Sequence, residues 1–237
     1  MLVVIEGIDG SGKGTVSKML VESLSTTLDM DDYEYRRDFY KVMSMSFPRY
    51  ADTLNGRLIA KYLNGEFGES THPYLHGTLY SLDRYESKSY LEGALLTHDI
   101  VVCDRYIPSN LCYSSMKAEK EERDEVVKHF VDLEYGHFEM PVPDLIFFLD
   151  VPVKFAVQNI AKKAARDYTD KSADIHEADE KYLRQVRSFY KNRLMEQHPE
   201  TEFKLIDCER NGHLLPFDEI VQQVQTMTIS TMMKGEL

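Results

Sequence analysis

The first fifteen residues hold the glycines and the lysine best suited to chemistry. Gly7, Gly10 and Gly12 precede Lys13 in a string that directly follows the apolar run at residues 2–6. Glycines let the backbone curl until its N–H groups face an anion, and a helix after the loop adds its positive N-terminal dipole. A lysine at this position reaches the outer phosphates of a nucleoside triphosphate. The pattern therefore predicts a phosphate-binding loop.

The loop departs from the strict pattern at one position. Gly14 follows Lys13 where serine or threonine usually contacts Mg²⁺, and Thr15 comes next. Either Thr15 or a water molecule is therefore expected at the metal. The residues that we predict to bind the triphosphate donor are Gly7, Asp9, Gly10, Ser11, Gly12, Lys13, Gly14 and Thr15.

A second cluster follows the apolar run at residues 101–103. Asp104, Arg105 and Tyr106 come directly after that run. An aspartate at the carboxyl end of a parallel strand can hold the water shell of Mg²⁺, and an arginine can fork onto phosphate oxygens. Asp-Arg-Tyr alone is more often a surface ion pair. Downstream of a phosphate loop, it favours a metal and phosphate site.

The string Ser-Phe-Pro-Arg-Tyr at 46–50 ends a further apolar run with Arg49 and without a carboxylate. A kinase that phosphorylates a hydroxyl usually needs a carboxylate base near the acceptor. A monophosphate acceptor needs none, because its second pKa is about 6 and it is largely dianionic at neutral pH. It needs cations between two phosphate groups, and Arg49, Arg105 and Lys13 would provide them.

The elements that must position these residues alternate along the chain. Strand-like runs alternate with segments of helical period, and this order predicts a parallel sheet covered on both faces, a three-layer α/β fold with five strands. The expected strands lie at 2–6, 41–47, 99–104, 144–150 and 203–207. The expected helices lie at 13–26, 52–64, 71–96, 109–135, 153–166, 178–197 and 215–228.

Composition limits the partners and the compartment. The 237 residues carry a formal net charge of −12, which argues against nucleic acid or an anionic membrane as a partner. Cys103, Cys112 and Cys208 follow no metal-ligand spacing and are expected to be buried free thiols in the reducing cytoplasm. The N-terminal run lacks the basic segment of a signal peptide, and no apolar run is long enough to span a bilayer.

Taken together and in order, these motifs resemble the thymidylate kinase family of P-loop nucleoside monophosphate kinases. The resemblance adds three further elements to the loop and to the Phe-Pro-Arg and Asp-Arg-Tyr strings. They are Tyr80 and Arg84 in Leu-Tyr-Ser-Leu-Asp-Arg-Tyr-Glu-Ser, the strand-like string at 143–152, and Asp-Ile-His-Glu at 174–177. The Gly-Lys-Gly-Thr ending of the loop resembles adenylate kinase.

The resemblance implies roles for residues that their type alone leaves open. Asp9 corresponds to the residue that meets the 3′-hydroxyl of the acceptor sugar, although an aspartate there could equally cap a turn. Phe47 and Tyr80 correspond to aromatics that pack on the base, and by spacing alone both would be core residues. Arg84 corresponds to a base contact and would otherwise belong to a solvated helix face. Tyr113 corresponds to the aromatic that disfavours a 2′-hydroxyl.

Two charged segments complete the expected organisation of a single kinase domain over residues 1–237. Residues 28–38 are interpreted as a solvated insertion, and residues 162–177 as the lid that the family places over the donor phosphates. Gly10 stands where some members carry a basic residue, so catalytic cations are expected from the lid. The candidates are Lys162, Lys163 and Arg166, with Lys171 as a weaker one; His176 is expected near the sugar or in solvent.

The resemblance implies phosphoryl transfer from ATP to dTMP, with Mg²⁺, by a homodimer. A kinase for another nucleoside monophosphate stays open. A deoxyribonucleoside kinase is the nearest alternative, and Arg49 argues against it. A GTP-binding switch protein would need an Asn-Lys-x-Asp string that this sequence lacks. A non-enzymatic α/β module is disfavoured, because three anion-suited strings follow successive strands.

Overall fold

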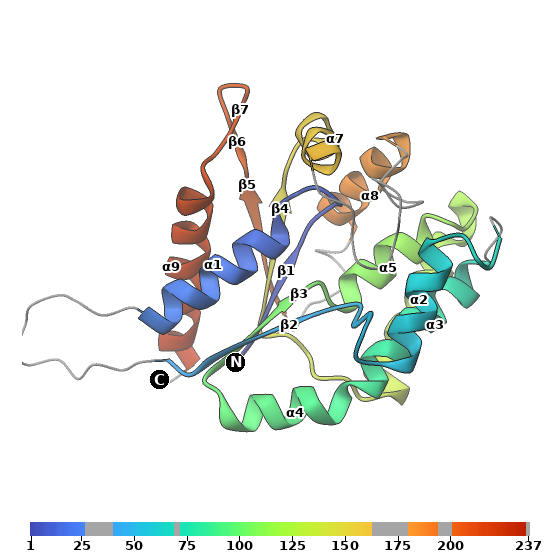
Figure 1. Cartoon of the computed structure of the whole chain (residues 1–237), viewed down its shortest axis with the longest axis horizontal. Coiled ribbons are helices and arrows are strands. Elements are labelled where there is room, and N and C mark those ends of the chain that lie inside the picture. Colours follow the sequence, from blue (N-terminus) through green and yellow to red (C-terminus); the bar gives the residue numbers. More distant parts are fainter. Residues whose placement is uncertain (27–39, 69–71, 163–179, 194–200, 236–237) are drawn as a thin grey trace, which may run out of the picture.

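The computed structural model describes residues 1–26, 40–68, 72–162, 180–193 and 201–235. Its centre is a five-stranded parallel sheet in the order β2-β3-β1-β4-β5 (Figure 1). The strands are β1 (Leu2–Glu6), β2 (Val42–Ser46), β3 (Ile100–Asp104), β4 (Leu145–Asp150) and β5 (Glu202–Asp207). This arrangement confirms the predicted α/β fold, and each strand ends within one residue of its predicted bounds.

Burial explains why the central strands are continuously apolar. β1 and β4 are buried at every residue, and β3 at every residue except Asp104. The edge strands β2 and β5 are only partly buried, which matches the serines of β2 and the charged residues of β5. Strands covered on both faces must be apolar throughout, so the runs in the sequence mark the interior of the sheet.

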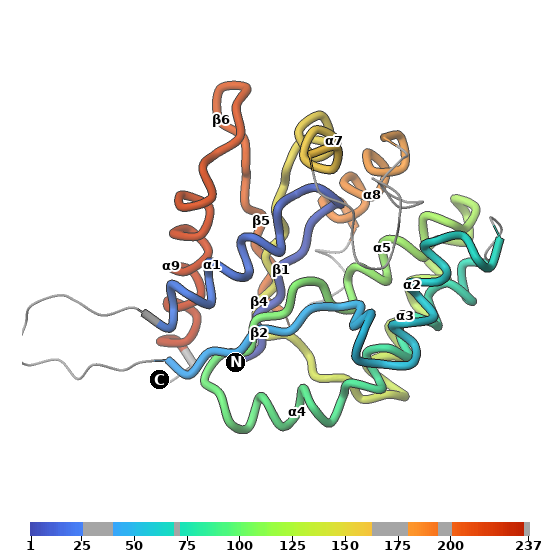
Figure 2. The backbone as a smooth tube through the Cα atoms, in the orientation of Figure 1, coloured from blue at the N-terminus to red at the C-terminus, as the bar shows by residue number. Residues whose placement is uncertain are grey.

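Helices cover both faces of the sheet. α1 and α9 pack together on one side, whereas α3, α5 and α6 pack together on the other (Figures 1 and 2). α8 contacts α5 and α7. The helices are α1 (Lys13–Thr26), α2 (Leu54–Leu63), α3 (Pro73–Glu86), α4 (Lys88–Thr97), α5 (Ile107–Ser115), α6 (Arg123–Val131), α7 (Val153–Lys162), α8 (Glu180–Asn192) and α9 (Phe217–Gly235).

Two predicted helices are divided in the structure. The stretch 71–96 forms α3 and α4, which separate at Ser87. The buried Ser87 hydroxyl donates to the carbonyl of Asp83 at 3.0 Å, a local bond that competes with helix continuation. The stretch 109–135 forms α5, a 3₁₀ turn (Lys120–Glu122) and α6, and a π-helical turn (Asp132–His137) follows.

A short antiparallel hairpin was not predicted. β6 (Glu209–Arg210) pairs with β7 (His213–Leu214) beyond the end of β5. Asn211 and Gly212 connect them with φ angles of 53° and 81°. Asn-Gly is the dipeptide that favours this turn, so the sequence contained the pattern. None of the described helices is long and apolar enough to cross a membrane.

Candidate active site

The phosphate-binding loop lies between β1 and α1, and helices α7 and α9 pack against it. Gly10 and Gly12 have φ angles of 78° and 83°, which favour glycine. A Cβ at Gly10 would lie 2.1 Å from the carbonyl oxygen of Ala156 in α7, and one at Gly12 would lie 2.6 Å from the ring of Phe217 in α9. Asn159 donates to the Gly10 carbonyl at 2.9 Å. These glycines are therefore required by packing as well as by the curl of the loop.

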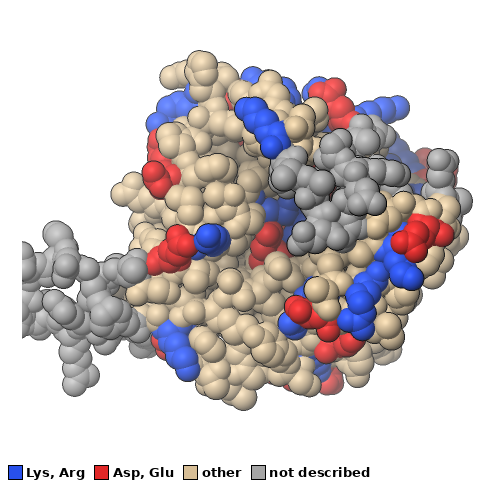
Figure 3. All heavy atoms as spheres, viewed as in Figure 1, with Lys and Arg blue, Asp and Glu red and all other residues tan. Residues whose placement is uncertain are grey.

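A cleft with about 960 Å³ of open space follows this loop, and we call it the loop cleft. The carboxyl ends of β1, β2 and β3 meet there, as expected for a parallel sheet. Figure 3 shows basic and acidic side chains in a hollow on this face of the molecule. The lining residues are Asp9, Gly10, Gly12, Lys13, Gly14, Thr15, Ser46, Phe47, Pro48, Tyr50, Asp104 and Arg105.

The residues beside Lys13 fit a magnesium ion. Oδ1 of Asp104 is buried and has no hydrogen-bond partner in the part of the chain that the structure describes. A Cβ on Gly14 would lie 2.9 Å from Oδ2 of the same carboxylate, so glycine leaves room for it. Thr15 is exposed and lines the same cleft. Mg²⁺ is usually bound by one or two carboxylates together with substrate phosphates and water, and Asp104 meets that need.

Asp9 is the centre of a charged cluster at the bottom of the loop cleft. Its Oδ1 accepts from the guanidinium of Arg105 and lies 3.6 Å from Nζ of Lys13, while Oδ2 accepts from the Tyr113 hydroxyl at 3.0 Å. Burial and the charge of Asp9 raise the pKa of Tyr113 well above its ordinary value, so this hydroxyl stays protonated and donates. The structure thus brings together four residues predicted from distant parts of the sequence.

Arg105 is held in an unusual backbone conformation. Its φ of 67° is uncommon for a residue other than glycine. Burial alone would lower the pKa of Arg105, but the Asp9 carboxylate outweighs that effect and the pKa rises. The guanidinium also donates to Ser109 Oγ at 2.9 Å, and its Cζ lies 5.3 Å from the centre of the Tyr113 ring. Arg105 is therefore fixed at the junction between the loop and α5.

The buried carboxylate of Glu6 supports this junction from below. It accepts from the backbone N–H of Tyr106 at 2.9 Å, from Ser109 Oγ at 2.7 Å and from the Tyr190 hydroxyl at 2.8 Å. Burial raises the pKa of Glu6 in spite of these donors and of nearby Arg105. Glu6 thereby ties the end of β1 to the turn that carries Arg105.

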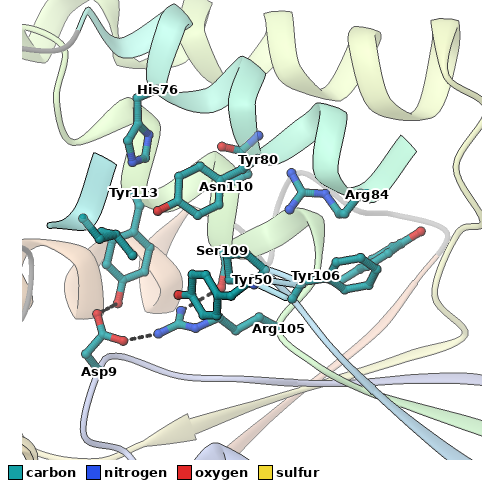
Figure 4. A pocket seen from close by; sticks show the side chains of 13 residues that line it. Asp9, Tyr50, His76, Tyr80, Arg84, Arg105, Tyr106, Ser109, Asn110 and Tyr113 are labelled. Carbon is teal, nitrogen blue, oxygen red and sulfur yellow. Dashed lines mark hydrogen bonds and ion pairs between the residues drawn. The ribbon is translucent and has the colours of Figure 1, made fainter. Parts of the chain in front are cut away.

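A second cavity, with about 560 Å³ of open space, adjoins the loop cleft, and we call it the aromatic pocket. Figure 4 shows the aromatic side chains gathered around it, with Asp9 and Arg105 at one end. Five residues line both cavities: Asp9, Phe47, Pro48, Tyr50 and Arg105. The other lining residues are Leu63, His76, Tyr80, Arg84, Tyr106, Ser109, Asn110 and Tyr113.

Arg84 belongs to the wall of this pocket and not to a solvated helix face. It is 2% exposed and forms a two-pronged ion pair with Glu134, from Nε at 2.5 Å and from Nη2 at 2.6 Å. Burial would lower the pKa of Arg84, but Glu134 reverses the direction and the pKa is raised. Tyr80, one turn earlier on α3, packs on His76 with 4.8 Å between ring centres.

Arg49 is placed differently from the other predicted cations. Its backbone N–H donates to Asp83 of α3 at 3.0 Å, which fixes the turn after β2. Its guanidinium donates to Oδ2 of Asp52 at 2.9 Å and lies 5.0 Å from the ring centre of Tyr90. Among the described residues, those that line the two cavities do not include Arg49. The structure therefore brings Lys13 and Arg105 together around Asp9 and leaves the Arg49 guanidinium outside the described lining of both cavities.

Several lining residues were not predicted from the sequence. Tyr50, His76, Ser109 and Asn110 come from β2's turn, α3 and α5, and no local pattern distinguishes them from core residues. Lys162 is exposed at the end of α7. The other lid candidates Lys163, Arg166 and Lys171, together with His176, which was expected near the sugar or in solvent, and the predicted insertion at 28–38, lie outside the described residues.

Comparison with known proteins agrees with this geometry. The family model for thymidylate kinase matches residues 5–213. A thymidylate kinase of Mycobacterium tuberculosis is 29% identical over 80% of this chain and 84% of its own length. A thymidylate kinase of Caenorhabditis elegans is 30% identical over 67% of this chain and 66% of its own length.

A solved structure supports the fold independently. A thymidylate kinase from Candida albicans superposes with a TM-score of 0.71 at 21% identity, and the match covers 98% of this chain and 92% of that one. The family match covers most of the chain, including the phosphate loop, the pocket and the Asp-Arg-Tyr turn. The chain belongs to the thymidylate kinase family.

Proposed function

We propose how the residues of the two cavities divide the work of one reaction, the transfer of a phosphoryl group from ATP to dTMP. As a member of its family the chain is an ATP-dependent nucleoside monophosphate kinase, and its products are dTDP and ADP. The proposal concerns which groups bind, which orient and which neutralise charge. Its main support is that the loop cleft and the aromatic pocket share the charged pair Asp9 and Arg105.

The loop cleft binds the ATP phosphates. Backbone N–H groups of the loop and the N-terminus of α1 face the anion, and Lys13 follows the transferring phosphoryl group. Asp104, with Thr15 or water, would hold Mg²⁺, which when bound neutralises charge on the donor phosphates. Asp104 is the described carboxylate whose buried, unpartnered oxygen supports this role.

The aromatic pocket binds dTMP with the base inward. Tyr80 and Phe47 pack on the base, Arg84 contacts its polar edge, and Asp9 receives the 3′-hydroxyl of the sugar. Tyr113 occupies the space that a 2′-hydroxyl would need. The acceptor phosphate then lies at the shared end of the two cavities, beside Arg105.

Catalysis in this arrangement is positioning and charge neutralisation. The acceptor phosphate arrives largely dianionic, so no side chain must remove a proton from it. Arg105 and Lys13 hold the two phosphate groups in line against their repulsion. Arg49 must break its ion pair with Asp52 to join them. Because the Asp52 side chain is 60% exposed, breaking this ion pair costs little free energy. Lys162 and the neighbouring residues 163–177 supply further cations from the lid.

The resemblance also leads us to propose a homodimer of single-domain subunits in the cytoplasm, without a nucleic-acid partner. The net charge of −12 supports the last point, since an acidic protein repels nucleic-acid backbones. Sedimentation of the purified full-length chain would measure its mass in solution.

One assay tests the assignment of the acceptor. The purified chain is incubated with ATP and Mg²⁺ against a panel of nucleosides and nucleoside monophosphates, and ADP release is followed. The highest kcat/KM is expected with dTMP. A nucleoside as best acceptor would favour the deoxyribonucleoside kinase alternative. If another nucleoside monophosphate is the best acceptor, the assignment of the reaction as monophosphate phosphorylation stands and only the assigned base is wrong.

A further inference from the structure

A buried glutamate outside the lining of both cavities joins two of the residues in the wall of the aromatic pocket. Glu134, in the π-helical turn after α6, is fully buried at 0% exposure. Its Oε2 accepts from Nε of Arg84 at 2.5 Å. Its Oε1 accepts from Nη2 of Arg84 at 2.6 Å, from Nδ2 of Asn110 at 2.9 Å and from Ser81 Oγ at 2.9 Å. Arg84 and Asn110 therefore converge on one carboxylate oxygen.

This carboxylate is the charged acceptor among the groups that orient the amide of Asn110, whose Nδ2 also lies 3.0 Å from Ser81 Oγ. A carboxylate paired with a guanidinium offers only acceptors, so Asn110 must turn its NH₂ group towards Glu134. The carbonyl of Gly77, 3.1 Å from the same Nδ2, imposes the same direction. The amide oxygen of Asn110 is left on the opposite side of the group. The orientation follows from the partners and not from the placement of two similar atoms.

The oxygen side of Asn110 has its own matched donors. Oδ1 accepts from Ser114 Oγ at 2.8 Å, and Ser114 Oγ is 2.9 Å from Nδ1 of His76. Because the serine hydrogen is used on Asn110, the serine oxygen accepts and Nδ1 of His76 carries the hydrogen. Oδ1 of Asn110 keeps a second lone pair. In the hydrogen-bond network that runs from Glu134 through Asn110 and Ser114 to His76, the donor and the acceptor of each bond are thus defined.

The result is a donor beside an acceptor on one wall of the pocket. Figure 4 shows the guanidinium of Arg84 and the amide of Asn110 on the same side of the cavity. Within the described residues, Arg84 donates to Glu134 from Nε and from one hydrogen of Nη2, so its Nη1 hydrogens remain for a ligand. That pair matches an imide edge, in which a carbonyl oxygen adjoins an N–H. An aminopyrimidine edge would set donor against donor and acceptor against acceptor.

We propose that Glu134 is the positioning residue that makes the pocket select an imide base over an aminopyrimidine, by fixing Arg84 as donor and the Asn110 oxygen as acceptor. The inference rests on the proposed function, because it assumes a pyrimidine monophosphate in the aromatic pocket. Glu134 acts through its two neighbours and has no contact with the substrate in this role.

The test compares dTMP with dCMP in the full-length wild type, Glu134→Gln, Glu134→Asp and Ser87→Ala. The wild type is expected to prefer dTMP by at least about 100-fold in kcat/KM. In Glu134→Gln the Gly77 carbonyl and the Ser114 hydroxyl still favour the same orientation of Asn110, but Arg84 loses its charged partner and Asn110 loses a carboxylate acceptor, so both are held less firmly. The ratio of kcat/KM for dTMP to kcat/KM for dCMP should fall about tenfold or more. The fall should come mainly from a higher KM for dTMP, with kcat and the KM for ATP little changed.

Two variants keep the test decisive if Glu134→Gln does not fold, since it leaves a buried guanidinium without its partner. Glu134→Asp retains the charge and should narrow the preference about threefold to tenfold. Ser87→Ala is the control: it removes a buried hydroxyl of the same region that donates to the Asp83 carbonyl and not to Glu134, so it should keep the wild-type ratio of dTMP to dCMP. If Glu134→Asp loses thermal stability but keeps the wild-type ratio of dTMP to dCMP, Glu134 is only structural. If the wild type itself does not use dTMP, the proposed function fails instead.

Discussion

The Tyr113 hydroxyl and the Asp9 carboxylate form a 3.0 Å hydrogen bond between residues 104 positions apart in the chain. The bond crosses the place where the loop cleft meets the aromatic pocket. Asp9 is 7% exposed, so bulk water would not replace a hydrogen-bond donor that the carboxylate loses.

Tyr113→Phe is therefore expected to lower kcat/KM for dTMP about 5- to 30-fold, from about 1–2 kcal/mol for an under-satisfied buried carboxylate. Steady-state kinetics with varied dTMP would measure it. Tyr182→Phe is the matched control, since its hydroxyl donates at 3.0 Å to the backbone carbonyl of residue 113 and not to Asp9. Equal kinetics for Tyr113→Phe and the wild type would show that the Tyr113 hydroxyl has no role in the use of dTMP.

Lys13→Ala should reduce kcat by about 100-fold or more with the fold retained. The reason is that Lys13 interacts with the charge that moves to the transferring phosphoryl group, so its loss affects the transition state most. Lys18→Ala, five residues along α1 and 78% exposed, is the control and should keep full activity. Thermal unfolding of both variants checks the fold. Substantial activity in Lys13→Ala would show that the loop does not hold the donor.

Tyr80→Ala should weaken dTMP binding by about 1–3 kcal/mol, the range for an aromatic stacked on a base, and leave binding of an ATP analogue unchanged. Titration calorimetry with each ligand separately would measure both affinities. Tyr85→Ala serves as control, because Tyr85 is on the same helix but stacks on Phe138 at 4.4 Å, away from the pocket lining. Equal losses for the two ligands would assign Tyr80 to the core.

The acceptor should be phosphorylated only if it already carries a phosphate. With thymidine, the residues that the turn after β2 contributes to the described lining, Phe47, Pro48 and Tyr50, offer no carboxylate base, and the cations meant for the acceptor phosphate have no partner. Arg49→Glu should abolish dTMP activity without creating thymidine kinase activity. Asp52→Asn, which releases the Arg49 guanidinium from its ion pair, should keep or lower the KM for dTMP. Faster turnover of thymidine than of dTMP by the wild type would contradict the monophosphate assignment.

The pH dependence of stability should reveal the buried Glu6. Its folded pKa is raised above the ordinary 4.5 by burial, so the folded chain binds this proton more tightly than the unfolded chain does. The free energy of unfolding of the wild type relative to Glu6→Gln should fall as pH rises from 4.5, by about 1.4 kcal/mol per pH unit, until the folded pKa is passed. Urea unfolding of both proteins from pH 4.5 to 8 measures the difference. A difference that grows with pH would show that the pKa is lowered instead.

Local patterns predicted the fold and the charged half of the site. Apolar runs located all five sheet strands, and the strings around Lys13, Asp104 and Arg105 located the loop cleft, because strand ends in a parallel sheet converge. The aromatic pocket was less predictable. Arg84 and Glu134 are 50 residues apart, and their pairing depends on how α3 packs beside the π-helical turn. The division of the predicted helix 71–96 at Ser87 depends on the hydrogen bond of one buried hydroxyl, and the hydrophobic periodicity of the sequence carries no signal of that bond.

Helix α3 contributes to both ends of the aromatic pocket. Tyr80 and Arg84 line the pocket itself. On the same helix, Asp83 accepts from the backbone of Arg49 at 3.0 Å, and Glu86 accepts from the first N–H groups of α2 at 2.9 and 3.2 Å. The turn that carries Arg49 is thus fastened to the helix whose Tyr80 and Arg84 line the aromatic pocket. On the proposed binding of dTMP, this one helix would set the distance between the base and Arg49, and the pocket would select for the length of the acceptor nucleotide as well as for its base.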